Sequence, residues 1–345
     1  MNTALDIEDT PSLIAYLYSA GRIDPHEQPL VHALSGGVSN RTVLVRRANG
    51  QNWVLKQALD KLRVAVDWFS SPERSQREAI GMRWLAQLAP PGAIPRLIFE
   101  DPSQNLLAME AVPEPHDNWK TLLLEGFIDD RHVVQFGELL GTIHRAAYER
   151  RSELSQEFAD RSFFESLRIE PYYAYTATQV AAAAGFLEKL IAETRAHRLT
   201  LVHGDYSPKN ILVHQDRLVL LDHEVIHWGD PAFDLGFSLA HLLSKGHYLL
   251  DLRSQFAKAA IRYRDSYFDI LGDVPWATGL EARWVQNVLG CLLARVRGRS
   301  KLEYLNEQHC MCQQAVVTDI MRVAPATIRE LTHEFTERLE HLERS

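Results

Sequence analysis

One stretch of the sequence, from His203 to Asp222, groups polar residues at spacings that suit phosphoryl transfer. It begins HGDYSPKN, and Asp222 follows the apolar run LVLL. One carboxylate, that of Asp205, can orient an attacking hydroxyl and accept its proton. The amide oxygen of Asn210 and the carboxylate of Asp222 can hold a magnesium ion that bridges phosphates. A solvated loop with a chance Asp and Asn is the alternative interpretation.

The same block carries a family resemblance. The segments HGDYSPKNIL, LLDHE and GDPAFDLGF resemble the aminoglycoside phosphotransferase and choline kinase family, which also includes methylthioribose and homoserine kinases. By motif the resemblance covers about residues 30–245. It implies a bilobal, protein-kinase-like fold with ATP and Mg²⁺ as cofactors. The implied partner is a small-molecule hydroxyl acceptor, such as a sugar, an amino alcohol or an aminoglycoside.

Roles for individual residues follow from this resemblance. It implies that Asp205 is the catalytic base and that Asn210 and Asp222 are the magnesium ligands. Asp234 would be a structural acid that holds the catalytic loop. The imidazole of His203 would bond to backbone rather than to metal.

The elements expected to position these residues divide the chain into two parts. Apolar alternation, turn residues and helix-start signals predict helices over 10–21 and 71–88 and strands over 31–34, 42–47, 52–56, 96–100 and 106–111. Beyond Trp119 the pattern is mainly helical, apart from a hairpin over 211–222. The prediction is an α+β fold with an antiparallel-sheet, nucleotide-binding N-lobe, residues 1–112, and a helical, catalytic C-lobe, residues 113–345.

Lys56 lies on the third predicted strand, and period-two alternation puts Val54 on the same face. In the family this face covers adenine and phosphates, so Val54 would touch the base and Lys56 the phosphates. A half-buried ammonium needs an anionic partner. Glu73 and Glu78 are candidates, and Glu78 is favoured because it lies on the apolar stripe of its helix. An exposed strand lysine is the alternative.

Two segments resemble the parts of the family that hold the nucleotide. A loop before the second strand could cover the phosphates with its backbone N–H groups, although it lacks a GxGxxG spacing; its residues are Ser35, Gly36, Gly37, Val38, Ser39 and Asn40. Glu110 to Val112 resemble the hinge that reads the adenine edge. Lys209 either reaches the transferred phosphoryl group or is solvated.

The sequence also departs from protein kinases. Gly204 stands where they usually have arginine, and Asp222 is followed by His223 and Glu224. Gly229 arrives so soon afterwards that no activation loop fits, which favours a constitutive small-molecule kinase over a protein kinase. Glu224 either supports a metal ligand or contacts metal or substrate itself. A pseudokinase or nucleotide-binding regulatory module is the rival from another class.

A basic run, Arg295, Arg297, Arg299 and Lys301, falls in the last third of the chain, in a segment expected to be helical. A solvated helix end is one interpretation. The other is a neutral or anionic polyhydroxylated acceptor rather than a polycation, since guanidinium forks suit carboxylates, phosphates and dense hydroxyls.

Length, net charge and cysteine content limit the kinds of protein that this sequence can encode. A length of 345 residues suits two lobes, and a net charge of −8 argues against a nucleic-acid partner. No apolar run approaches the roughly 20 residues that span a bilayer, and the N-terminus lacks the pattern of a signal peptide. The chain has three cysteines, an odd number, which argues against a framework of disulfide bonds. The expectation is a cytoplasmic protein without a membrane partner.

Overall fold

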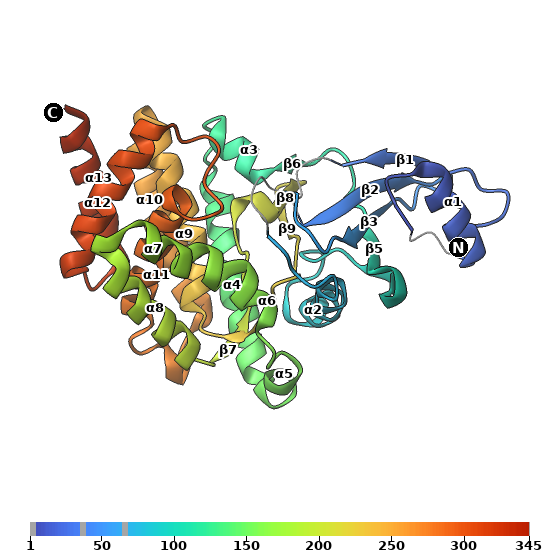
Figure 1. The fold of residues 1–345 in the computed structure, drawn as a ribbon, viewed down its shortest axis with the longest axis horizontal. Coiled ribbons are helices and arrows are strands. Elements are labelled where there is room, and N and C mark those ends of the chain that lie inside the picture. The colour runs from blue at the N-terminus through green and yellow to red at the C-terminus, as the bar shows by residue number, and fades with distance from the viewer. Residues whose placement is uncertain (1–4, 35–38, 64–67, 345) are drawn as a thin grey trace.

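The computed structural model describes residues 5–34, 39–63 and 68–344. Figure 1 shows an elongated molecule, with a β-sheet and helices α1 (Thr10–Ser19) and α2 (Arg74–Leu88) towards the N-terminal end. A larger helical body makes up the other end and carries the C-terminus. The predicted α+β architecture is confirmed.

Five strands form the main sheet, in the order β1-β2-β3-β5-β4, and every neighbouring pair is antiparallel. Their bounds are β1 (Leu30–Ala33), β2 (Asn40–Arg46), β3 (Trp53–Ala58), β4 (Leu97–Asp101) and β5 (Leu106–Glu110). The turn between β2 and β3 contains Gly50 at a φ of 77°, a left-handed conformation that glycine adopts without strain. The division predicted after residue 112 lies just beyond β5 and stays a prediction.

Alternation along the central strands divides this sheet into two faces. One face is buried against α1, where Val43, Leu55 and Ala108 form a small core with Leu13 and Leu17 of that helix. Because α1 covers this face, the side chains of β3 that alternate with Leu55 must point to the opposite side. Those side chains are the ones that matter for the site.

The opposite face carries Val54 from β3 and Met109 from β5, and α2 packs beside it through Met82. The helix begins at Arg74, later than the predicted start at residue 71, because the residues before it form a turn. Gly81 allows α2 to approach the segment beyond β9 closely, since an added Cβ would come within 2.9 Å of Ile226 Cγ2. Helix α2 therefore touches both the sheet and the segment that follows β9.

The helical body is organised around α9, which is buried along its length from Ala232 to His247. Helix α9 packs against α10 and α11, and α10 packs against α4. The helices of this body are α3 (Trp119–Leu124), α4 (Asp130–Glu149), α5 (Arg151–Glu157), α6 (Ser162–Phe164), α7 (Tyr175–Gln179), α8 (Ala184–Ala196), α9 (Ala232–Tyr248), α10 (Arg253–Leu271), α11 (Leu280–Arg297), α12 (Glu307–Ile320) and α13 (Ile328–Arg344). Among the described residues, no helix combines the length and the apolar character that crossing a membrane requires.

Short strands in this body hold the segment from His203 to Asp222. Strand β7 (Thr200–Val202) pairs with β10 (His227–Gly229), and β6 (Asp117–Asn118), β8 (Ile211–His214) and β9 (Arg217–Leu220) form a small antiparallel sheet. The predicted hairpin is therefore present as β8 and β9. Residues 203–210 connect β7 to β8, and Asp222 lies two residues after the end of β9.

Candidate active site

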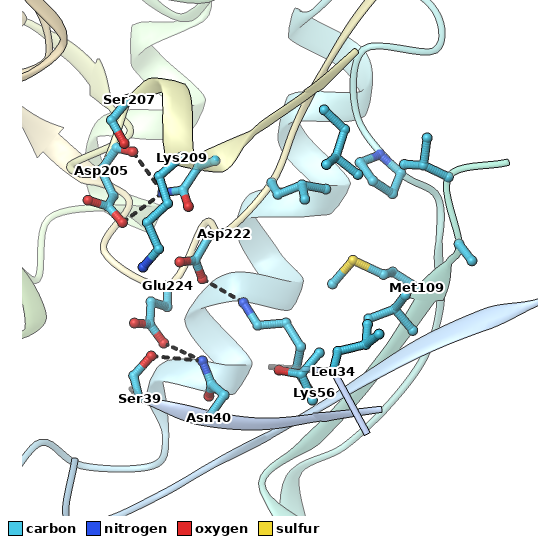
Figure 2. Close-up of a pocket in the computed structure, with 18 of the residues that line it drawn as sticks. Leu34, Ser39, Asn40, Lys56, Met109, Asp205, Ser207, Lys209, Asp222 and Glu224 are labelled. Carbon is cyan, nitrogen blue, oxygen red and sulfur yellow. Dashed lines mark hydrogen bonds and ion pairs between the residues drawn. The ribbon is translucent and has the colours of Figure 1, made fainter. Parts of the chain in front are cut away.

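A cavity of about 1060 Å³ is lined by residues from both parts of the molecule. The sheet contributes Val54, Lys56 and Met109, and the loops beside the short strands contribute Asp205 and Asp222 (Figure 2). Further residues singled out in the sequence also line it, namely Ser39, Asn40, Glu110, Val112, Lys209, Asn210, Glu224, Arg295, Arg299 and Lys301. Four others lie outside the described residues, namely Ser35, Gly36, Gly37 and Val38.

Lys56 connects the sheet to the loop after β9. Its Nζ lies 2.7 Å from Oε1 of Glu78 and 2.6 Å from Oδ1 of Asp222. The lysine side chain is only 11% exposed, so the alternative of a solvated strand lysine is wrong. Glu78 rather than Glu73 is the partner, as the apolar stripe of α2 indicated.

Burial and charge act in opposite directions on these three groups. Burial lowers the pKa of the Lys56 ammonium, but the carboxylates of Asp222, Glu78 and Glu224 outweigh it and hold that pKa above its usual range. Burial raises the pKa of Glu78 to about 7, against the opposing charge of Lys56. Burial also raises the pKa of Asp222, but Lys56 outweighs it and holds that pKa below its usual range. At neutral pH Lys56 and Asp222 therefore form an ion pair.

Oxygen ligands for a cation gather beside this ion pair. Glu78, Asp222 and Glu224 each offer a carboxylate oxygen, and these oxygens lie within 4.8 Å of one another. Asp222 has a φ of 68°, in the left-handed region that aspartate enters more readily than most residues. Oδ1 of Asn210, which also lines the cavity, accepts none of the hydrogen bonds recorded among the described residues. A hard cation such as Mg²⁺ prefers such oxygen donors, so the residues present fit it.

Both carboxylate oxygens of Asp205 have a partner. Nδ2 of Asn210 donates to Oδ2 at 2.7 Å, and Nη2 of Arg168 lies 2.8 Å from Oδ1. Arg168 is buried and comes from η2 (Glu165–Ala174), a π-helical segment in the helical body. Sequence reasoning missed Arg168, because nothing in its local spacing connects it to a loop 36 residues later.

The conformation of Gly204 leaves no room for a side chain at this position, so the guanidinium beside Asp205 comes from Arg168, which is distant in the sequence. Its φ is 78°, and an added Cβ would lie 2.9 Å from the carbonyl oxygen of Val225. A side chain at position 204 would therefore meet both backbone strain and a clash. Nε of Arg168 instead donates to the carbonyl of Gly204 at 2.7 Å, which places a guanidinium beside Asp205.

Asp234 holds the turn before Asp205. Its carboxylate accepts from the backbone N–H groups of His203 at 2.6 Å and Gly204 at 2.8 Å. Nδ1 of His203 accepts from the backbone N–H of Asp205 at 3.1 Å, and Nε2 lies 3.1 Å from Nδ1 of His223. These contacts agree with the structural parts that the sequence suggested for Asp234 and His203.

Arg74 ties the loop after residue 38 to the catalytic segment. The side chain is fully buried and donates from Nε to Glu224 at 3.1 Å and from Nη2 to the carbonyls of Ser39 and Leu59. Asn40 Nδ2 also donates to Glu224, at 3.0 Å (Figure 2). Glu224 therefore has two donors from the sheet side of the cavity. Arg74 is a second residue that sequence reasoning missed.

The connection after β5 supplies backbone at the edge of the cavity. The N–H groups of Glu110 and Ala111 donate to the carbonyls of Arg96 and Asn52. The N–H of Val112 makes none of the hydrogen bonds recorded in the described ranges. It is therefore a free donor in the predicted hinge.

The sequence matches the model of the phosphotransferase enzyme family over residues 31–272, which is more than half of the chain. The chain belongs to this family. Among curated proteins, this phosphotransferase is 24% identical over 219 residues to a methylthioribose kinase from Pectobacterium atrosepticum, covering 55% of this chain and 53% of that protein. It is 25% identical over 266 residues to methylthioribose kinase 2 from Oryza sativa subsp. japonica, covering 68% and 62%. The chain thus spans little more than half the length of these relatives.

Solved structures support the fold of this phosphotransferase. Amicoumacin kinase in complex with AMP-PNP, Ca²⁺ and Ami superposes with a TM-score of 0.56 at 14% identity, covering 91% of this chain and 94% of that one. A choline/ethanolamine kinase family protein from Mesorhizobium loti gives a TM-score of 0.56 at 15% identity, covering 95% and 99%. The bilobal, protein-kinase-like fold expected from the sequence is thereby confirmed.

The basic run of the phosphotransferase is not one solvated helix end. Helix α11 ends at Arg297, so Arg299 and Lys301 lie in the loop beyond it, contrary to the helical prediction. Arg295, Arg299 and Lys301 line the cavity. Arg297 instead donates to Gln314 and lies 2.9 Å from Oε1 of Glu307 on α12.

Proposed function

We propose that this phosphotransferase transfers the γ-phosphoryl group of MgATP to a hydroxyl of a small molecule, with Asp205 as the base. The observation that carries the proposal is the meeting, in one cavity, of the Lys56–Asp222 ion pair with the Asp205–Asn210 pair. Phosphoryl transfer asks little covalent chemistry of a protein, so positioning and charge provide most of the catalysis. These four side chains can supply both.

The nucleotide would lie against the sheet. Val54 and Met109 offer an apolar surface to adenine, and the free N–H of Val112 offers a hydrogen bond to its edge. Lys56 would bind the phosphates, and Ser39 and Asn40 line the cavity beside it. The AMP-PNP complex of amicoumacin kinase, which has the same fold, supports a nucleotide here.

Asn210 and Asp222 would hold the magnesium ion, with Glu224 as a further oxygen donor. When bound, magnesium neutralises the charge that builds up on the phosphates. Glu78 keeps Lys56 in place at 2.7 Å, so that its ammonium stays at the phosphate end of the cavity. Lys209, which lines the cavity, would contact the transferred group.

Asp205 would orient the acceptor hydroxyl and take its proton. Arg168 and Asn210 each use one lone pair of a carboxylate oxygen, which leaves others on both oxygens for the acceptor. Two fixed donors also restrict rotation of the carboxylate. The base is therefore held in position before the acceptor binds.

Two rival functions remain testable. A protein kinase is disfavoured because the chain runs from Asp222 to β10 and α9 within ten residues, which leaves no activation segment. A pseudokinase or nucleotide-binding regulatory module would bind MgATP without turnover. The assembled base and its two donors favour an active enzyme over such a module.

The test measures ADP release with panels of sugars, sugar acids, amino alcohols, aminoglycosides and a denatured protein substrate. Asp205→Asn should lower turnover of the accepted compound by about 10²–10⁴-fold, because it removes the proton acceptor but little volume. MgATP affinity should stay within about twofold of wild type. The control is Asp216→Asn, an exposed residue whose side chain is 67% accessible. Near wild-type turnover in Asp205→Asn would sink the assignment of the base, and MgATP binding without any turnover would favour the regulatory module.

A further inference from the structure

Beyond Asp205 the cavity continues into an end with a basic wall. The wall comes from η2, from α9, and from the last turn of α11 with the loop after it. We call it the basic end, and the residues that define it are Arg168, Tyr172, Phe237, Arg295, Arg299 and Lys301. None of the residues that line the cavity from these elements is acidic.

A continuous set of contacts connects the base to this wall. Arg168, which lies 2.8 Å from Asp205, has its guanidinium carbon 5.8 Å from the ring centroids of both Tyr172 and Phe237. The hydroxyl of Tyr172 in turn accepts from Nη1 of Arg295 at 2.8 Å. A small molecule seated on these two rings would thus have Asp205 at one side and Arg295 at the other.

Arg295 is a buried cation without an acidic partner. Its residue exposure is 8%, and no ion pair joins it to any described carboxylate. Nη1 makes its hydrogen bonds, to Tyr172 and to Ser300, while Nη2 makes none with the described residues. Leaving a buried charge unpaired is costly, so such a group commonly marks the place of a charged ligand.

The buried group whose charge acts on Arg295 from α9 is a second basic side chain rather than an acid. Lys245 is fully buried, and its recorded hydrogen bond is to the carbonyl of His241 at 3.3 Å. Burial, together with Lys120 and Arg295, lowers the pKa of Lys245 to about 7. The carboxylate whose charge acts against this shift, that of Glu303, is already paired with Lys120.

The two remaining cations stand nearer the solvent. Arg299 pairs with Glu170 at 3.1 Å and lies over the ring of Tyr175, with its guanidinium carbon 4.6 Å from the centroid. Lys301 is exposed and makes no ion pair within the described ranges. After Glu170 and Glu303 have paired, Arg295 and Lys301 are left without a carboxylate partner among the described residues.

We propose that the basic end binds an anionic group of the acceptor, a carboxylate or a phosphate, while the acceptor's hydroxyl points to Asp205. This inference rests on the proposed kinase function. A guanidinium offers a planar fork of donors that matches both anions, which Arg295 would use through its free Nη2. A polycationic acceptor would meet like charges here and no free carboxylate.

The test compares acceptors that differ only in the anionic group. The pairs are glycerate with glycerol, gluconate with sorbitol, and ribose 5-phosphate with ribose, at matched concentrations with saturating MgATP. In at least one pair, kcat/KM for the charged member should exceed that of the neutral member by about tenfold or more, the value of one charge-assisted hydrogen bond. A preference confined to gluconate or glycerate identifies a carboxylate, and one confined to ribose 5-phosphate identifies a phosphate.

Variants then assign the preference to the wall. Arg295→Gln should raise KM for the charged acceptor by about tenfold or more and leave KM for ATP within about twofold. Lys301→Gln, at an exposed position that tolerates change, should raise KM for the charged acceptor by about threefold. Arg297→Gln, whose native side chain faces α12, should change neither KM for the acceptor nor KM for ATP.

Calorimetric titration of the same compounds into the MgADP-bound protein gives a readout that needs no turnover. Equal use and equal binding of charged and neutral members would overturn the proposal. The proposal would also be overturned if no charged compound bound at millimolar concentration. A change confined to KM for ATP in Arg295→Gln would overturn it as well. A wild-type protein that fails to bind MgATP would instead overturn the proposed kinase function.

Discussion

At the scale of single residues, Asp222 meets two demands at once. Its carboxylate is the partner of Lys56 at 2.6 Å, and it lies among oxygens that could hold a cation. Its left-handed backbone turns the chain sharply after β9, towards α2. Without a nucleotide, the ammonium of Lys56 offsets the negative charge of the Asp222 carboxylate. When magnesium and phosphates bind, Asp222 would pair with the metal ion and Lys56 with the phosphates, so this ion pair would have to loosen.

Asp222→Ala should abolish turnover and weaken nucleotide binding only when magnesium is present. The carboxylate would hold the ion and the ion the phosphates, so MgATP affinity should fall by about tenfold or more, while ATP in excess EDTA should bind both proteins alike. Fluorescence titration with a labelled nucleotide, with and without Mg²⁺, gives the two affinities. Asp251→Ala, an exposed aspartate on the helical body, is the control. Equal MgATP affinity in wild type and Asp222→Ala would show that Asp222 is no ligand.

At the scale of elements, α2 presents one functional face. Arg74, Glu78 and Gly81 lie at i, i+4 and i+7, and therefore on the same side of the helix. Arg74 bonds to Glu224, Glu78 to Lys56, and Gly81 approaches Ile226. The helix has no side-chain hydrogen bond at its N-cap, and the guanidinium of Arg74 donates to the carbonyls of Ser70 and Ser71 in the segment before it.

Arg74→Met should lower the free energy of unfolding by about 3–5 kcal/mol, because it removes the cation and one of the two donors from buried Glu224 and leaves several buried carbonyls without a donor. Urea denaturation followed by circular dichroism measures the change. Arg83→Met removes a half-exposed arginine of the same helix, paired with Glu100, and should change stability by less than about 1 kcal/mol. A loss no larger in Arg74→Met than in Arg83→Met would contradict the part assigned to this side chain.

The sequence predicted those contacts that follow from short motifs or from the periodicity of a single strand or helix. The pairing of Lys56 with Glu78 followed from strand and helix periodicity, and the loop around Asp205 from a compact motif. Arg168 could not be predicted, because its contact with Asp205 depends on how η2 packs against the loop. The basic run stayed open between a solvated end and an acceptor contact, because only the packing of α11 shows that Arg295 and Arg299 line the cavity while Arg297 pairs with α12.

At the scale of the whole molecule, the helical body and the site contain histidines that must stay neutral. Burial lowers the pKa of His203 and holds those of His223 and His241 well below their usual range. It lowers the pKa values of His227 and His247 to about 4, from an ordinary value of 6.5. Between these values the unfolded chain binds protons that the folded chain does not. The contribution of these histidines to stability is therefore present above about pH 6.5 and is lost as the pH falls towards 4.

His227→Gln should flatten this acid dependence. His227 lies against Phe164, with 4.0 Å between ring centroids, and cannot protonate there without losing that packing environment. The free energy of unfolding of wild type should fall between pH 6.5 and 4.5, and the variant should lose about one proton's share of that slope, about 1.4 kcal/mol per pH unit. Urea titrations at several pH values measure it. His333→Gln, at a position 69% exposed, should keep the full slope, and an unchanged slope in His227→Gln would refute the account.

Trp68 gives the molecule a built-in optical reporter. Its indole N–H donates across the cavity to the carbonyl of Ser166 at 3.2 Å, in the same segment η2 that carries Arg168. Trp68 is the one tryptophan of the described chain that lines the cavity, while Trp119 and Trp284 are fully buried elsewhere. Emission from Trp68 therefore depends on the polarity around this contact between the two sides of the cavity. The arrival of ligands between them can be timed by stopped-flow fluorescence without any attached dye.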